Sequence, residues 1–162
     1  MANEGKDARS SLDSLGFLIG DWTGHGVQHF GENKSMEFDV RMMCRKTEDG
    51  SGLEMIEFDD NLDQGMFHGE QSFIYMDEKE GKLRLRRTWF ESGYNSILTF
   101  LEDVSVKEGE IVASSPPRKA DAYLSTLSIK KGDESTLLSE GKLHFDNKDW
   151  PLEVTFKRVG SK

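Results

Sequence analysis

The clearest pattern along this chain is a strict alternation of apolar and charged side chains between residues 36 and 42. Successive side chains of a β-strand point to opposite faces, so a period of two predicts a strand with one buried and one solvated face. Residues 48–52 then supply the Asp and Gly that tight hairpin turns favour. The apolar positions, all on the parity expected to face inward, are Met36, Phe38, Val40, Met42 and Cys44.

Similar short runs continue to the end of the chain, separated by turn-forming residues. No helical period occurs between them, and Pro116-Pro117 predicts a break or a sheet edge. About ten short strands joined by hairpins predict an all-β fold, a single antiparallel up-and-down β-barrel. The further predicted strands are 53–59, 66–76, 82–90, 94–102, 104–107, 110–114, 122–130, 136–145 and 152–159.

The N-terminal segment follows a different pattern. Residues 1–10 are polar, which predicts a flexible N-terminus. Residues 11–19 predict a short helix of about two turns, because Leu12, Leu15 and Leu18 recur at helical spacing on one face. We therefore expect a flexible stretch over 1–10 and one lipocalin-like barrel domain over 11–160.

Composition narrows the classes of partner. With 162 residues the chain fits one domain. A formal charge of −9 argues against a general nucleic-acid binder and against docking on an anionic membrane. Cys44 is the single cysteine, which fits a reducing compartment. The polar start resembles no signal peptide, and no apolar run is long enough for a membrane helix, so we expect a cytoplasmic protein.

Two short motifs at the ends of the chain carry a family resemblance. Gly20-Asp21-Trp22 follows an apolar turn, Gly24 and Gly26 extend it to Trp-x-Gly-x-Gly, and Lys157-Arg158 lies near the end of the last predicted strand. In these features the chain resembles the calycin superfamily of lipocalins, fatty-acid-binding proteins and nitrobindin-like barrels. The resemblance implies that Gly20, Trp22 and Arg158 close one end of the barrel, with Arg158 lying across the Trp22 ring.

A closed barrel of about this size leaves interior room for one small ligand. Leu83 and Leu85 are apolar on the odd parity of their strand, so Arg87 and Trp89 are also expected to face inward. A buried Arg must be paired or must face a cavity. Arg87 is therefore either an anchor for a carboxylate-bearing ligand, or one half of an internal ion pair, or a side chain reaching the barrel mouth. The predicted ligand-binding residues are Arg87, Trp89, Phe38, Met42, Phe73 and Tyr75.

The strand over 66–76 offers two faces. The aromatic residues Phe67, Phe73 and Tyr75 share one parity and are interpreted as the core face. His68 and Glu70 take the other parity and are expected to be exposed. The alternative is that His68 and Glu70 flank a small polar ligand.

The remaining histidines and the cysteine are weaker candidates. His25 and His29 would stand about 13 Å apart on a strand, too far for one metal ion. His144 alternates with the apolar Leu143 and Phe145 and is expected to face solvent. Nitrobindin-like proteins carry their haem-ligating histidine in the last strand, and 152–159 has none, so we expect neither a metal nor a haem cofactor. Cys44 is interpreted as a buried structural thiol.

The sequence therefore predicts binding of a small hydrophobic or amphipathic ligand inside a barrel, without catalysis. One alternative is a haem-binding or other enzyme-like barrel, with His68, Glu70 and Arg87 as its first candidate residues. Another alternative is an interaction module that forms a homodimer through its outer face.

Overall fold

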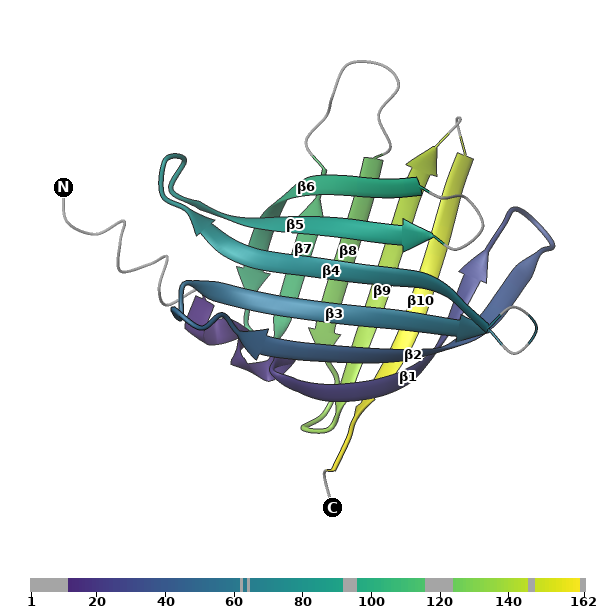
Figure 1. The fold of residues 1–162 in the computed structure, drawn as a ribbon, viewed down its shortest axis with the longest axis horizontal. Coiled ribbons are helices and arrows are strands. Elements are labelled where there is room, and N and C mark those ends of the chain that lie inside the picture. The colour runs from purple at the N-terminus through teal and green to yellow at the C-terminus, as the bar shows by residue number, and fades with distance from the viewer. Residues whose placement is uncertain are drawn as a thin grey trace.

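A computed structural model describes residues 12–61, 63, 65–91, 96–115, 124–145 and 148–160. Its strands form a closed antiparallel barrel in which each strand pairs with the next in sequence and β1 pairs with β10 (Figure 1). The predicted fold class is confirmed. The strands are β1 (Gly20–His29), β2 (Ser35–Lys46), β3 (Gly52–Asn61), β4 (Gly65–Asp77), β5 (Lys82–Glu91), β6 (Ser96–Lys107), β7 (Glu110–Ser114), β8 (Leu124–Lys131), β9 (Thr136–Phe145) and β10 (Lys148–Arg158).

Most predicted strands lie within one observed strand, with one exception. The runs 94–102 and 104–107 belong to the single strand β6, because Asp103 continues the ladder by pairing with Arg84 on one side and Ser114 on the other. Residues 1–10 and Pro116-Pro117, for which flexibility and a break were predicted, lie outside the described residues.

Part of the predicted N-terminal helix lies within the described residues. Leu12 and Asp13 are helical, and they are followed directly by a 3₁₀ helix, η1 (Ser14–Leu18), whose Leu15 and Leu18 are fully buried. Gly16 lies in the centre of η1, although glycine is a poor helix former. In the part of the chain that the structure describes, no helix combines the length and the apolar character needed to cross a membrane.

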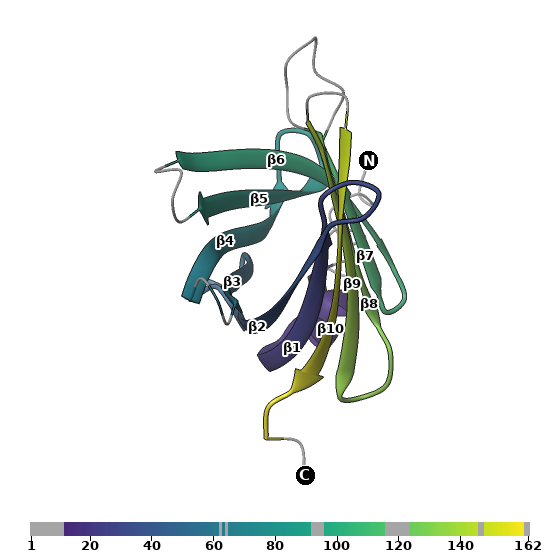
Figure 2. The same ribbon diagram turned by 90° about the vertical axis from the view of Figure 1, so that its right-hand side faces the viewer.

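The barrel is flattened into two layers. Strands β3–β6 run across strands β7–β10, and β1 and β2 connect the two layers along one side (Figures 1 and 2). Inward side chains of both layers meet η1 at one end and form an apolar core there. The largest fully buried apolar side chains of this core are Trp22, Phe156, Leu15, Leu18, Ile74, Leu85, Ile111 and Leu137. This end of the barrel is therefore filled, and any ligand space must lie elsewhere.

Candidate functional site

A cavity of about 1230 Å³ occupies the part of the barrel that the core leaves unfilled. Its two walls differ in chemistry. The wall formed by β3–β5 presents His68, Glu70, Ser72 and Arg87, together with Glu57. The opposite wall comes from β8–β10 and β2 and is largely apolar, with Leu127, Ile129, Leu143, Leu152, Val154, Phe38 and Met42. A space with one polar and one apolar wall suits a small amphipathic molecule.

Arg87 is the centre of the polar wall, and it is already paired. Its Nε donates to Oε2 of Glu102 at 2.7 Å and its Nη2 to Oε1 at 3.0 Å, a bidentate ion pair. Glu102 has no exposed surface, and Ser125 Oγ donates to its Oε1 at 2.6 Å. A second carboxylate, that of Glu70, lies 3.5 Å from Arg87 Nη1. Of the interpretations of Arg87, the structure therefore shows the internal ion pair.

The charge of Arg87 is retained despite its burial. Burial lowers the pKa of the guanidinium, but the negative charges of Glu70 and Glu102 outweigh this effect, and the net result is a raised pKa. Aromatic rings also surround the cation. Its Cζ lies 5.2 Å from the centre of the Trp89 ring and 5.8 Å from that of Phe100. Trp89 is held against Phe100 at 4.6 Å between ring centres. Arg87 and Trp89 thus form one rigid unit beside the cavity.

Glu57, Asp59 and Glu70 bring further carboxylates to the same wall. Ser72 Oγ donates a hydrogen bond to Glu70 Oε1. Burial raises the pKa of Glu57 well above its ordinary value, and the neighbouring charges of Asp59 and Glu70 raise it further. By surface area Glu57 is only half-buried, but the surface that it keeps faces the cavity. Its carboxyl group is consequently protonated over a wider pH range than that of an exposed glutamate.

The predicted orientation of strand β4 is wrong. Ser72 and Ile74 are buried at 1% and 0% exposure, so the even positions of β4, including His68 and Glu70, face the interior. By strand alternation Phe73 and Tyr75 face outward, and neither lines the cavity.

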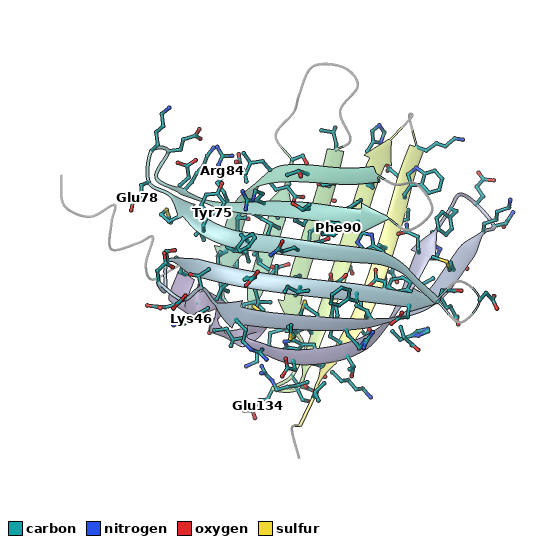
Figure 3. The ribbon with its side chains drawn as sticks, in the orientation of Figure 1. Lys46, Tyr75, Glu78, Arg84, Phe90 and Glu134 are labelled. Carbon is teal, nitrogen blue, oxygen red and sulfur yellow. The ribbon has the colours of Figure 1, made fainter. Side chains whose placement is uncertain are left out.

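On the outer face of β4, the aromatic residues Phe73 and Tyr75 lie beside basic side chains of the neighbouring strand β5. The Arg86 guanidinium lies 5.2 Å over the Phe73 ring. Tyr75 pairs across the strands with Arg84 (Figure 3), and Arg84 is itself held by Asp103 and by Glu80. These contacts cover apolar ring surface that the sequence pattern assigned to the core.

The other predicted ligand-binding residues lie where their parity placed them. Phe38, Met42, Arg87 and Trp89 all line the cavity. Met36 and Met55 line it as well, so three methionines contribute flexible thioether side chains to its walls.

At the closed end, Arg158 lies over Trp22 with 4.2 Å between its Cζ and the centre of the indole ring. Trp22 Nε1 donates to the carbonyl of Leu18 at 2.9 Å. Arg158 donates to the carbonyls of Ile19 at 2.7 Å and Phe17 at 3.3 Å. The last carbonyls of a short helix have no partner within it, so these two side chains satisfy the end of η1.

Gly20 makes this arrangement sterically feasible. Its φ of +152° favours glycine, and a Cβ at this position would overlap the Arg158 guanidinium. The absence of a side chain at the first residue of β1 therefore leaves space for the guanidinium of Arg158 from β10.

The histidines and the cysteine remain outside the polar network, except for His68. His25 lies 3.3 Å from Asp39, and His144 lies 2.7 Å from Asp149, both at exposed positions. Within the described ranges, no three His, Cys, Asp or Glu side chains are placed to hold a metal ion. Burial raises the pKa of the Cys44 thiol to about 12, so it is protonated at neutral pH.

Sequence reasoning missed two acidic members of the polar wall, Glu57 and Asp59, and two residues of the network that holds Arg87, namely Glu102 and Ser125. The signal was present in the parity of their strands. Glu57 lies two positions after the buried Met55, and Glu102 lies two positions from both Phe100 and Val104, which face inward. Each of the two glutamates therefore takes the inward parity of its strand. The inward parity of these strands therefore continues through their charged residues.

Comparison with known proteins supports the fold. No family model matches the chain, and no curated protein matches it. The crystal structure of Rv2717c from M. tuberculosis is similar, with a TM-score of 0.64 and 13% identity over 94% of this chain and 99% of that one. The S-type phycobiliprotein lyase CPES from Guillardia theta is similar with a TM-score of 0.66 and 10% identity, over 100% of both chains. At these identities the likeness concerns the fold alone, a closed antiparallel β-barrel.

Proposed function

We propose that this barrel reversibly binds a small, largely apolar molecule in its interior. The observation that carries the proposal is the cavity of about 1230 Å³ between an apolar wall and a polar wall. Small-molecule sites are typically concave, mostly apolar, and supplied with a few polar groups that fix orientation. No chemical step is part of the proposal.

The apolar wall supplies the affinity. Burying about 200 Å² of apolar ligand surface contributes about 5 kcal/mol before the entropic losses of binding. Met36, Met42 and Met55 can adjust to ligands of different shape, because an unbranched thioether side chain has several accessible rotamers. The paired charges of the polar wall would then orient whatever polar group the ligand carries.

A neutral fluorescent probe, N-phenylnaphthylamine, tests the proposal. We expect saturable fluorescence enhancement with one site per chain. Leu152→Trp should weaken probe binding at least tenfold, because it fills the cavity from β10. Leu138→Trp is the matched control, since Leu138 is 44% exposed on the outer face of β9. An absence of saturable enhancement, or equal binding by wild type and a folded Leu152→Trp variant, would overturn the proposal.

A further inference from the structure

The cavity is strongly acidic. Two cationic side chains, Lys34 and Arg87, face it from the described residues. Some of the acids at the mouth have local partners: Asp60 accepts from Arg41 at 3.0 Å, and Asp39 lies beside His25. A negative interior repels an anionic ligand and attracts a cationic one. The carboxylates that line the cavity are Glu37, Asp39, Glu57, Asp59, Asp60, Asp63 and Glu70.

Among the described cavity residues, the buried cation Arg87 is not available as an anchor for an anion. Glu102 occupies Nε and Nη2 of Arg87, and Glu70 lies against Nη1. A ligand carboxylate approaching Arg87 would have to displace Glu70 or Glu102, leaving a buried carboxylate without a counter-charge. A fatty acid is therefore a poor fit to this wall.

Glu57 is an acidic group of the inner wall that remains open to a ligand. Its carboxyl group makes no hydrogen bond and no ion pair with the described residues, and its free surface faces the cavity. The ionisable groups around it are Asp59 on its own strand, His68 and Glu70 on β4, and Arg87 on β5. From β2 it is paired with the apolar Met42. Glu57 is therefore a carboxyl group in a desolvated position, flanked by the acids Asp59 and Glu70 as well as by His68 and Arg87.

We infer that the molecule bound in this cavity is an amphipathic amine, or a similar cationic nitrogen base, whose N–H groups are received by Glu57 and Glu70 while its apolar body lies against β8–β10. The Trp89 ring beside these acids adds a surface that attracts cations. This inference rests on the proposed function and gives that site a ligand class.

Cation binding should also move a proton. In the empty cavity the raised pKa of Glu57 favours its neutral form, whereas an adjacent ammonium group favours the carboxylate. An amine bound at Glu57 therefore releases a proton from that residue, and its affinity rises with pH while Glu57 titrates. A neutral ligand of the same length releases none.

A matched series of octylamine, octanol and octanoate separates charge from apolar bulk. Each competes with N-phenylnaphthylamine, and calorimetry of octylamine in phosphate and in Tris buffer measures the protons released. We expect octylamine to bind at least tenfold more tightly than octanol, as one charge-assisted hydrogen bond allows. Octanoate should bind more weakly than octanol, and proton release should accompany octylamine alone.

Two variants locate the effect. Glu57→Gln keeps the shape of the side chain but removes its charge, and should reduce the preference for octylamine over octanol by about tenfold. Glu54→Gln is the matched control on the outer parity of the same strand, where Gln71 donates to its carboxylate, and should leave the preference unchanged. If Glu57→Gln does not fold, proton release by the wild-type protein still decides the inference.

The outcomes are distinguishable. Probe binding combined with octanoate binding as tight as octylamine overturns the amine inference and leaves the proposed function standing. Octylamine binding without proton release, or with an unchanged preference in Glu57→Gln, also overturns the amine inference. If neither the probe nor any member of the series binds, both the inference and the proposed function are overturned.

Discussion

Two arginine–tryptophan pairs among the described residues of the barrel differ in their surroundings. At the closed end, Arg158 stacks on Trp22, and both side chains donate to backbone carbonyls at the end of η1. Beside the cavity, Arg87 lies near Trp89 and donates to the carboxylate of Glu102. The Nε1 atom of Trp89, unlike that of Trp22, has no hydrogen-bond partner among the described residues.

The difference shows how one pair of residue types serves two ends of a protein. Around Trp22 the indole N–H and two guanidinium nitrogens of Arg158 donate to backbone carbonyls within a packed core, so the pair stabilises the fold. Around Trp89 the charge of Arg87 is paired within the protein, but the indole N–H lacks a partner among the described residues and a large cavity is adjacent. Functional sites commonly retain such departures from full packing and full hydrogen bonding.

Truncation of the two tryptophans should give the largest difference. Trp22→Ala removes a 2% exposed side chain from a filled core and should lower the free energy of unfolding by about 4 kcal/mol. Trp89→Ala should lose about 1–2 kcal/mol, since a cavity already borders its ring. Urea denaturation of both variants measures this. Equal losses would show that the two ends are packed alike, contrary to the comparison.

Next in size is the effect of breaking the Arg87–Glu102 pair. Glu102→Ala should lower the free energy of unfolding by about 3 kcal/mol, because it leaves Arg87 buried with the more distant Glu70 as its remaining partner. Arg87→Met combined with Glu102→Leu should recover part of that loss, since it removes both charges of the pair and leaves only Glu70 without Arg87. A double-mutant cycle of Arg87→Met and Glu102→Leu from chemical denaturation gives the coupling. A double variant as unstable as Glu102→Ala would contradict this account of the polar wall.

A smaller effect is expected at the closed end from Gly20→Ala. The added Cβ overlaps the Arg158 guanidinium at a φ that favours glycine, so we expect a loss of about 2 kcal/mol. Gly16→Ala is the control, because nothing lies within 4 Å of a Cβ there, and it should be neutral or slightly stabilising. Thermal unfolding of the two variants separates a contact with Arg158 from a general effect of alanine.

The smallest expected effect is the pH dependence of stability at Glu57. Its pKa is raised in the folded protein, so the native state binds more protons than the unfolded chain once pH exceeds the ordinary glutamate value. Relative to Glu57→Gln, the wild type should therefore lose stability as pH rises from about 4.5 through the raised pKa, and the two should converge below it. Melting curves of both proteins over this pH range measure the direction of the change in stability. A stability difference that is independent of pH would show that the pKa of Glu57 is not raised in the folded protein.

The period-two pattern predicted most of the fold, because alternation reports directly which face of a strand is buried. It placed Arg87 and Trp89 on the inward face from Leu83 and Leu85 alone. It failed in β4, where residues that look apolar face out beneath arginine side chains and His68 and Glu70 face in. Glu102 was missed although it shares the inward parity of Phe100. Its burial depends on Arg87 and on Ser125 from β8, and a strand read in isolation does not show such partners.

The bonds from Arg158 to Phe17 and Ile19 join positions 141 and 139 residues apart in sequence. The ribosome must therefore synthesise β10 before Arg158 can bond to the end of η1. Until then, the edge of β1 that pairs with β10 in the finished barrel has no partner strand. Contacts of such sequence separation slow folding. Newly made chains consequently expose the unpaired edge of β1, a site where another chain could pair, for most of their synthesis.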